Sequence, residues 1–454
     1  MKEQNALNRR QFLKLAGLTA GAVALASCTA PIAPSAPGES AADAGTAAEG
    51  VTLRYRTWHA PAQSAGDAAW YEWLSDNYTA ATIEYENVPF GAEYIQKVLA
   101  DSAAGTPPDL LHSSIIWARE FYDRDVLLDL DDYIANVPEL APDQFYGEAT
   151  NTYRSKDGNY YGVPWEGPDA EILAVNSTLL EAAGFDPQGA DLQTWDDLIE
   201  MAQALTVRDG DEVTQAGYLV PNFREIQYFN SLLTSNGGAM HDEAISQATF
   251  NNEQGLQVLQ LELDLMNEYN VSFPISPDRQ DEQLFMQGNA AIIHAGTWST
   301  AQFQDQMAEE FEYWFVIIPQ GPQGSGRAGT TWSNMFVLPK GTPNPDAAWD
   351  LLQYCTTPPV VVTRFEISTR TTPHKAIFES EKWTEVLQTA PQKEVMIAAA
   401  EAGGVYPFFP FVTEANDAIG IELEQVVTGG KDPQEALNEA ERKVNEVIAR
   451  RTNA

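Results

Sequence analysis

Short strand patterns alternate with helix patterns along the first part of the chain. Residues 51–58 alternate in polarity, as expected of a half-buried strand, and residues 83–88 and 109–112 also have strand character. The stretches between them, 69–80 and 93–104, have helix character. Strands that alternate with helices indicate βαβ units and a mostly parallel sheet, so the predicted fold class is α/β.

The first 28 residues have the features of an export signal. Arg9 and Arg10 are followed by Phe-Leu-Lys, the pattern of a twin-arginine address. The apolar run over 15–26 is shorter than the roughly 20 residues that cross a bilayer, so it is predicted to be a signal segment. It ends at Leu-Ala-Ser-Cys, which resembles the lipobox of bacterial lipoproteins and implies that Cys28 becomes the lipid-modified first residue. The alternative is a chance cysteine in a protein without an anchor.

Residues 29–50 are rich in Ala, Pro, Ser, Gly and Thr and have no apolar periodicity. Such a segment buries too little apolar surface to order itself, so it is predicted to be a flexible tether. The remaining chain of about 400 residues is too long for one small core, which predicts two lobes.

The composition excludes several classes of function. A net charge of −39 argues against nucleic acid and against anionic lipid head groups as partners. With Cys28 lipidated, the one other cysteine, Cys355, has no partner within the chain for a disulfide. The five histidines lack the spacing of a metal motif, so neither a metal nor a cofactor is expected. Acidic residues are numerous, and a catalytic carboxylate pair therefore stays open.

Several tryptophans fall at the ends of the expected strands. In open α/β sheets, ligands bind outside the carboxyl ends of the strands. A single tryptophan at such a place is explained by core packing, but recurrence favours a ligand site. Flat apolar rings beside carboxylates and amides suit a sugar, whose C–H faces stack and whose hydroxyls need hydrogen bonds. Three tryptophans come at or just after such ends, namely Trp58, Trp117 and Trp298. Trp165 opens the exit of a predicted hairpin, and Trp332 precedes a further predicted strand.

A series of short motifs follows in a fixed order over almost the whole mature chain. They are Ala-Gly-Thr-Pro-Pro-Asp at 104–109, Tyr-Gly-Val-Pro-Trp at 161–165, Asn-Ser-Thr-Leu-Leu-Glu-Ala-Ala-Gly at 176–184, Thr-Trp-Asp-Asp-Leu at 194–198, Phe-Met-Gln-Gly-Asn-Ala-Ala at 285–291, Gly-Thr-Trp at 296–298, Ala-Ala-Trp-Asp-Leu-Leu at 347–352 and Glu-Ala-Leu-Asn-Glu-Ala at 435–440. The order of these motifs resembles that of a known family, the extracellular solute-binding proteins of bacterial sugar importers driven by ATP-binding cassettes. This is the family 1 group that includes maltose-binding protein.

The resemblance implies a two-lobed periplasmic-binding-protein-like fold of type II, in which each lobe is a mostly parallel sheet flanked by helices and hinge strands join the lobes. The predicted segments are 1–28 as signal peptide, 29–50 as tether, 51–165 as the first part of lobe 1, 166–332 as the first part of lobe 2, 333–372 as the second part of lobe 1, and 373–454 as the C-terminal helices of lobe 2.

The resemblance also implies roles for individual residues. Trp298 matches the aromatic residue that stacks on sugar from the second lobe, and Glu166 matches a hinge carboxylate that binds hydroxyls. His59, Arg119 and Asn334 are expected to select hydroxyls as well. The complete set of predicted ligand-binding residues is Trp58, His59, Trp117, Arg119, Trp165, Glu166, Trp298, Trp332, Asn334 and Phe408.

The function that follows is expected to be capture, without catalysis, of a mono- or oligosaccharide for delivery to the permease subunits of an ATP-binding-cassette importer. The protein is expected to be an exported monomer that meets the membrane only through its lipid anchor, at the outer face of the cytoplasmic membrane or in the periplasm and cell envelope. Alternatives are a binding protein for an anion, a peptide or a metal, a sensor that signals to a membrane receptor, or a surface enzyme that acts on glycans.

Overall fold

The structure is a computed structural model that describes residues 50–59, 65–146, 154–155, 158–223, 225–273, 281–307, 311–368, 370–402, 404–409 and 411–452. The predicted signal peptide, with Cys28, and all of the predicted tether except Gly50 lie outside these residues. No helix in the described part of the chain combines the length and the apolar character that crossing a membrane requires.

The main sheet has the strand order β2-β1-β3-β9-β4-β7, with β10 beside β9 and β8 beside β4. Two further strands, β5 and β6, pair only with each other. The strands are β1 (Thr52–Thr57), β2 (Thr82–Asn87), β3 (Leu110–Ser113), β4 (Val163–Asn176), β5 (Val207–Asp209), β6 (Glu212–Gln215), β7 (Ile292–Gly296), β8 (Tyr313–Val316), β9 (Thr330–Val337) and β10 (Gly404–Val405).

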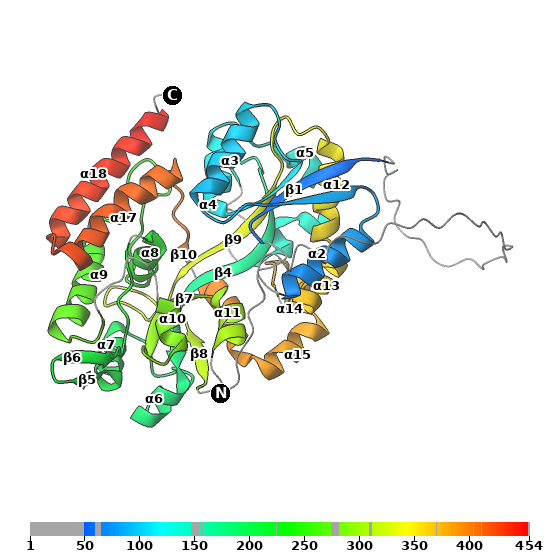
Figure 1. Cartoon of the computed structure of the whole chain (residues 1–454). Helices are drawn as coiled ribbons and strands as arrows, with labels where there is room; N and C mark the ends of the chain where they lie inside the picture. The colour runs from blue at the N-terminus through cyan, green and yellow to red at the C-terminus, as the bar shows by residue number, and fades with distance from the viewer. Residues whose placement is uncertain are drawn as a thin grey trace, which may run out of the picture. The chain divides into compact units, whose positions relative to one another are not determined.

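Helices connect and flank these strands (Figure 1). They are α2 (Ala65–Asn77), α3 (Ala92–Ala103), α4 (Ile115–Asp123), α5 (Asp131–Ile134), α6 (Ser177–Ala183), α7 (Trp195–Leu205), α8 (Ile226–Ser235), α9 (Glu253–Leu263), α10 (Asp281–Met286), α11 (Ser299–Gln306), α12 (Pro345–Thr356), α13 (Pro358–Ser368), α14 (Lys375–Phe378), α15 (Glu381–Thr389), α16 (Val395–Ala402), α17 (Val412–Gly429) and α18 (Pro433–Thr452).

The predicted βαβ units are present, but the sheet as a whole is mixed. β1 pairs in parallel with β2 and with β3, and α2 and α3 connect these strands in sequence. β9 pairs antiparallel with β3 and with β4, and β4 pairs antiparallel with β7 and β8. The expectation of a mostly parallel sheet therefore holds only for β1–β3 and for the short pair of β10 with β9, because β4 and β9 run in opposite directions through the middle of the sheet.

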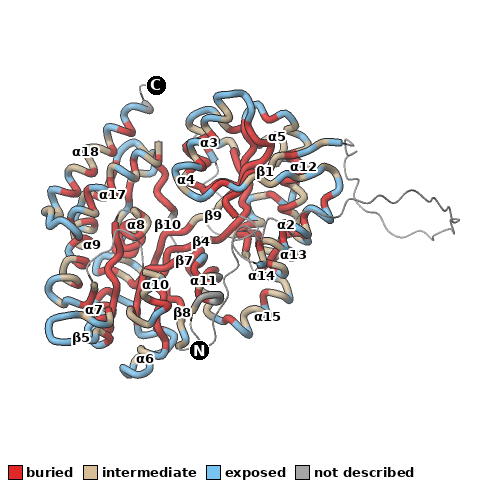
Figure 2. The backbone as a smooth tube through the Cα atoms, in the orientation of Figure 1, coloured by how far each residue is buried: buried red, intermediate tan, exposed pale blue. Residues whose placement is uncertain are grey.

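The strands β4 and β9 join two cores. Near its start, β4 pairs Val163 with Phe336 of β9, in the same region as the β1–β3 strands. Further along, β4 pairs Ala170 with Thr331 and then continues alongside β7 and β8. Most of β4 is buried over its 14 residues (Figure 2). The β4–β9 ladder shifts register on both sides of Glu166, so the pairing is irregular where the chain passes from one core to the other.

Gly167 lies at this irregular point with φ +128, a region that L side chains rarely adopt. A Cβ atom there would stand 2.8 Å from Ser333 Oγ and 2.9 Å from the Asp169 backbone nitrogen. Glycine is therefore required for the backbone between Glu166 and Asp169 to follow its path.

The first lobe has a core made by β1, β3, β9, α2 and α12. Leu53, Trp70, Leu110, Phe336 and Leu351 are among its fully or almost fully buried members. Helices α13, α14 and α15 add a smaller apolar cluster next to it, since α13 packs on both α2 and α12. The predicted segment 373–454 thus contains helices with two sets of neighbours, because α18 packs on α17 and α9, and α17 packs on α18, α4 and α9.

The second lobe is built around the far end of β4. Ile172 of β4, Phe285 of α10, Ile293 of β7 and Phe315 of β8 share one buried cluster. Helix α7 begins as its sequence predicts, because the Thr194 side chain accepts from the Asp197 backbone nitrogen while the Asp197 side chain accepts from the Thr194 backbone nitrogen.

A chain of buried polar side chains runs through the second lobe. His294 Nε2 on β7 lies 2.9 Å from the Tyr218 hydroxyl, and Tyr218 donates to Glu262 Oε1 of α9 at 3.1 Å. Burial lowers the pKa of His294 to about 3, so the imidazole is neutral at pH 7. Burial raises the pKa of Glu262 to about 8, against the opposing effect of the Tyr218 hydrogen bond. Glu262 is therefore protonated in the native protein at neutral pH.

We expect Glu262→Gln to stabilise the protein increasingly as the pH rises from about 4.5 to 8. The wild type must take up a proton at Glu262 on folding in this range, because its native pKa lies above that of the unfolded chain, and glutamine removes this cost. At pH 8 the gain in free energy of unfolding should be on the order of 4 kcal/mol. Urea denaturation at pH 4.5, 6 and 8 measures it.

The matched control is Glu268→Gln, which changes an exposed glutamate in the same part of the chain. It should leave the pH dependence of the wild type unchanged. A gain for Glu262→Gln that is constant across the three pH values would contradict a protonated native Glu262.

Candidate functional site

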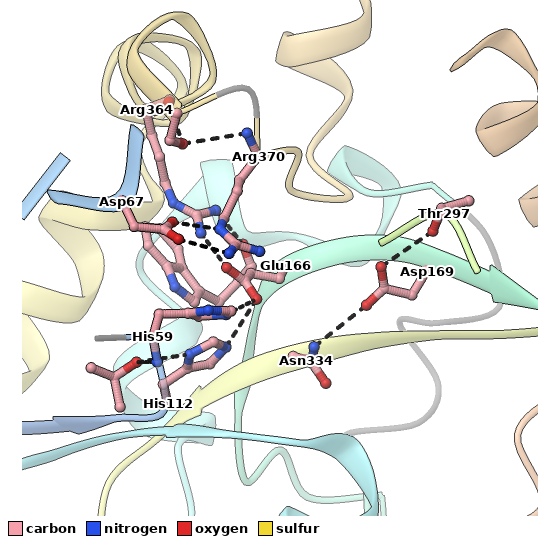
Figure 3. Close-up of polar contacts among 12 residues, drawn as sticks. His59, Asp67, His112, Glu166, Asp169, Thr297, Asn334, Arg364 and Arg370 are labelled. Atoms are coloured by element: carbon pink, nitrogen blue, oxygen red, sulfur yellow. Dashed lines mark hydrogen bonds and ion pairs between the residues drawn. The ribbon is translucent and has the colours of Figure 1, made fainter. Parts of the chain in front are cut away.

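Glu166 of β4 is the point on which several ionic side chains converge (Figure 3). Its side chain is 8% exposed. Oε1 accepts a hydrogen bond from Arg364 Nη2 of α13. Oε2 lies 2.9 Å from His59 Nε2 and 3.4 Å from His112 Nε2. His59 follows β1, and His112 belongs to β3. Glu166 therefore connects β4, the strand that passes from one core to the other, to the carboxyl ends of β1 and β3.

Aromatic rings hold the guanidinium of Arg364 in place. Its central carbon lies 4.1 Å from the centroid of the Trp165 ring, which in turn stacks on Phe336 at 4.3 Å. Arg370, six residues further along, pairs with both oxygens of Asp67 at 2.5 and 2.8 Å. Each of these two arginines is thus matched by a carboxylate inside the protein.

The surroundings of Glu166 and His112 determine the charge of these two side chains. Burial alone would raise the pKa of Glu166, but His59, His112 and Arg364 together hold that pKa well below its usual range. Burial lowers the pKa of His112 well below 6.5, with Glu166 acting in the opposite direction. At neutral pH the site therefore combines an ionised carboxylate with a neutral imidazole.

A stack of aromatic side chains covers the histidines. Trp58 stacks on His112 with ring centroids 3.8 Å apart and planes 20° apart. Trp117 meets Trp58 edge-on at 5.4 Å and stacks on Tyr94 at 5.0 Å. Phe90 lies over Trp117 at 4.3 Å and is itself 61% exposed. Trp58 and Trp117 are therefore buried members of a packed cluster, and Phe90 is its exposed edge.

A second group, which we call the hinge patch, consists of Trp298, Trp332, Asn334 and Asp169. Trp298 follows β7, is 38% exposed, and lies 5.3 Å from the Trp332 ring of β9. Its ring folds back over Gly296, where an added Cβ would stand only 2.0 Å from the indole. The glycine two residues before the tryptophan is thus what allows the ring to lie there.

Asp169 brings a carboxylate to the hinge patch. Its two oxygens accept long hydrogen bonds, one from Thr297 Oγ1 at 3.3 Å and one from Asn334 Nδ2 at 3.4 Å (Figure 3). The side chain keeps some contact with solvent, yet desolvation and then the charge of Glu166 raise its pKa to about 7. Asp169 can therefore either accept or donate hydrogen bonds near neutral pH.

The structure brings together most, but not all, of the predicted binding residues. Trp58, His59, Trp117, Trp165 and Glu166 meet around the ionic cluster, and Trp298, Trp332 and Asn334 meet in the hinge patch. Arg119 instead pairs through Nε with both oxygens of Asp123, one turn along α4, at 3.1 Å. Phe408 is 8% exposed and belongs to the large apolar core near Tyr406.

Three residues at the site were not predicted as ligand contacts: His112, Asp169 and Arg364. The position of His112 in the third strand was a usable signal, because the strand end was expected to face the ligand. Asp169 lies three residues beyond Glu166 on the same strand. Arg364 gave no comparable signal, since it stands 198 residues from its partner Glu166.

Metal binding is a further possibility for part of this site. Among the histidine, cysteine and acidic side chains that the structure describes, His59, His112 and Glu166 lie close enough together to hold a metal ion. The spacing of the histidines along the sequence had predicted no metal site.

A separate cavity of about 480 Å³ opens beside the first residues of β1 and β2. None of the described residues that line it is charged.

We expect Glu166→Gln to lower the free energy of unfolding at pH 7 by about 3 kcal/mol, because it leaves the buried guanidinium of Arg364 without a counter-charge. Urea denaturation measures this loss. Arg364→Met keeps apolar volume beside Trp165, so the double variant should be less destabilised than the sum of the two single variants. Additive losses would show that the two side chains do not interact.

The comparisons with known proteins agree with this architecture. The family model described as "Bacterial extracellular solute-binding protein" matches residues 60–362, well over half of the chain. A binding protein of Brucella abortus is 24% identical over 280 residues, covering 60% of this chain and 64% of that protein. A maltodextrin-binding protein of Bacillus subtilis is 22% identical over 268 residues, covering 58% and 60%. The matched regions thus span less than two thirds of these relatives.

Solved structures match over more of the chain. A solute-binding protein of an ABC transporter from Thermotoga lettingae, bound with alpha-D-tagatose, superposes with a TM-score of 0.74 at 21% identity, covering 88% of this chain and all of that one. A cyclic alpha-maltosyl-1,6-maltose binding protein from Arthrobacter globiformis gives 0.74 at 21% identity, covering 88% and 99%. At such identities the likeness shows the fold alone, the two-lobed periplasmic-binding-protein fold. Together with the family match, it places this chain among the bacterial extracellular solute-binding proteins.

Proposed function

We propose that the protein captures a carbohydrate between its two lobes and delivers it to the permease of an ATP-binding-cassette importer. The observation that carries the proposal is the hinge patch, where the half-exposed rings of Trp298 and Trp332 adjoin the carboxylate of Asp169 and the amide of Asn334. Rings supply flat apolar area for the C–H face of a sugar, and the carboxylate and amide supply partners for its hydroxyls.

The roles of the predicted binding residues divide accordingly. Trp298, Trp332 and Asn334 are proposed to contact the sugar directly, together with Asp169. Trp58, Trp117, Trp165 and Glu166 are proposed to shape the first-lobe side of the site from behind, because they are buried and engaged with one another. His59 lies at the edge of that group. Direct sugar contacts by Arg119 and Phe408 stay predictions.

The names of relatives and neighbours support a sugar as the ligand. They include a lactose-binding protein of Rhizobium radiobacter, the maltodextrin-binding protein of Bacillus subtilis, and solved structures with tagatose or maltose bound. The variety among these ligands leaves the particular sugar to experiment.

Delivery is proposed to follow from closure of the lobes. A ligand that contacts both lobes favours the closed arrangement, and the permease would recognise that arrangement. The proposed lobes follow the predicted segments, 51–165 with 333–372 and 166–332 with 373–454. Export by the twin-arginine signal and lipidation at Cys28 would keep the protein at the cell surface on the tether of residues 29–50.

The ionic pairing weakens two alternatives. An anionic solute would need unpaired cationic groups, but Arg364 and Arg370 are already matched by Glu166 and Asp67. A glycan-cleaving enzyme would need two carboxyl groups that face the substrate, and both oxygens of Glu166 are engaged by Arg364 and His59.

The first experiment measures thermal unfolding of the purified protein against a panel of mono- and oligosaccharides. A sugar that binds the native state should raise the midpoint as its concentration increases. A flat panel, with the protein folded and free of carried-over ligand, would overturn the proposal that the solute is a sugar.

With the sugar identified, Trp298→Ala should raise its Kd at least tenfold, measured by titration calorimetry, because the exposed platform is lost. The unfolding midpoint without ligand should change little, since the ring is partly exposed. Ile421→Ala, which truncates an exposed apolar side chain of α17, serves as the control and should bind as the wild type does. Unchanged affinity in Trp298→Ala would remove this residue from the site.

A further inference from the structure

The three side chains that meet at Oε2 of Glu166 form an unusual group for a buried position. His59, His112 and Glu166 are 8%, 0% and 6% exposed. One possible ligand atom from each residue, a ring nitrogen of each histidine and a carboxylate oxygen of Glu166, lies within 4.8 Å of the other two. Two imidazoles and one carboxylate are a known donor set for zinc in proteins.

We propose that His59, His112 and Glu166 bind a divalent transition-metal cation of the Zn²⁺ type. The proposal goes beyond sugar capture, because it concerns the support of the site and can be tested without any sugar. Imidazole nitrogen favours Zn²⁺ and its transition-metal neighbours, whereas Mg²⁺ and Ca²⁺ prefer a shell of oxygen atoms.

The distances between the ligand atoms fit such an ion. Ligands held 2.0–2.1 Å from a tetrahedral Zn²⁺ stand roughly 3.3–3.5 Å apart. His112 Nε2 is 3.4 Å from Glu166 Oε2, and His59 Nε2 is 2.9 Å from the same oxygen. An ion would need the His59 ring to withdraw by about half an ångström, which a side chain at the edge of the cluster can do.

His112 provides a second, independent observation. Its Nε2 atom is fully buried and makes no hydrogen bond to any side chain or backbone group in the described part of the protein. The neighbouring Glu166 oxygen lies at 3.4 Å but outside hydrogen-bond geometry. Buried polar atoms are rarely left without a partner, and a bound ion is one of the recognised explanations.

The surrounding groups orient the three ligands as in known metal sites. His112 Nδ1 lies 3.3 Å from Thr57 Oγ1, which also accepts the His59 backbone N–H at 3.1 Å. Donation from Nδ1 to Thr57 leaves the Nε2 lone pair free to face the ion. Arg364 occupies Oε1 of Glu166 and so keeps Oε2 turned toward the histidines. The guanidinium charge of Arg364 opposes the charge of the ion, so the two imidazole nitrogens and the Glu166 oxygen together must outweigh this repulsion.

An ion at this place would tie β4, the strand that crosses between the lobes, to the ends of β1 and β3 in the first lobe. Three protein ligands leave a fourth position of a tetrahedral ion for water or another oxygen ligand. The site would therefore stiffen the first-lobe side of the proposed sugar site.

The test adds ZnCl₂ to the purified protein after treatment with EDTA and removal of the chelator. Titration calorimetry should give one equivalent of bound Zn²⁺, and Zn²⁺ should raise the unfolding midpoint while Mg²⁺ does not. Co²⁺ in place of Zn²⁺ should give the visible absorption of a four-coordinate site. His112→Gln should weaken Zn²⁺ binding at least 100-fold, and His59→Gln should remove the Co²⁺ spectrum.

The matched control is His241→Gln, which removes a histidine of the second lobe whose Nδ1 lies 2.8 Å from the Asp242 carbonyl oxygen. It should bind Zn²⁺ as the wild type does. If His112→Gln does not fold, as judged by cooperative unfolding in EDTA, His59→Gln alone decides the question. Lack of stoichiometric Zn²⁺ binding by the wild type, or wild-type affinity in a folded His59→Gln or His112→Gln variant, would overturn the proposal. The sugar titrations are to be run in EDTA, so that no metal ion is present. The outcome of the Zn²⁺ experiments then has no effect on them, and the two proposals are tested separately.

Discussion

A carboxylate on a side chain that is 8% exposed must be compensated by its neighbours, and Glu166 draws its partners from three separate parts of the chain. Arg364 comes from α13, His59 follows β1, and His112 lies in β3. The carboxylate itself belongs to β4, which continues into the second lobe. Trp165 packs against the Arg364 guanidinium, and Trp58 stacks on the neutral His112 ring, so two partners of Glu166 are each covered by an aromatic side chain.

The fold was largely predictable because its signals are local. The polarity pattern of β1 and the capping box at Thr194 each involve residues within a few positions of one another. The mixed direction of the sheet was not predictable in this way, since it depends on β4 pairing with β9 more than 150 residues later. No local pattern encodes such a pairing, and its antiparallel sense corrects the expectation of a mostly parallel sheet.

The residues of the candidate site also fall into those that the sequence could predict and those that it could not. Trp298 could be proposed from Gly-Thr-Trp after a strand, and the structure gives the glycine a steric reason. Trp58 and Trp117 also follow strand ends, but they face His112, Tyr94 and each other, so their position relative to a strand did not reveal how deeply they are buried. The Glu166–Arg364 pair and the convergence of His59 with His112 depend on tertiary contacts and could not be read from spacing.

The irregular pairing of β4 with β9 on both sides of Glu166 affects how the sheet can deform. In a regular antiparallel ladder, every second register position is a hydrogen-bonded pair. The β4–β9 ladder is interrupted between Pro164 and Glu166 and again between Glu166 and Asp169, so fewer hydrogen bonds hold the two strands together there. The weakest pairing of the two strands therefore lies in a span of a few residues that also carries both carboxylates of the site. A rotation of one lobe against the other would change the surroundings of Glu166 and Asp169, so the charge of these two carboxylates would depend on the angle between the lobes.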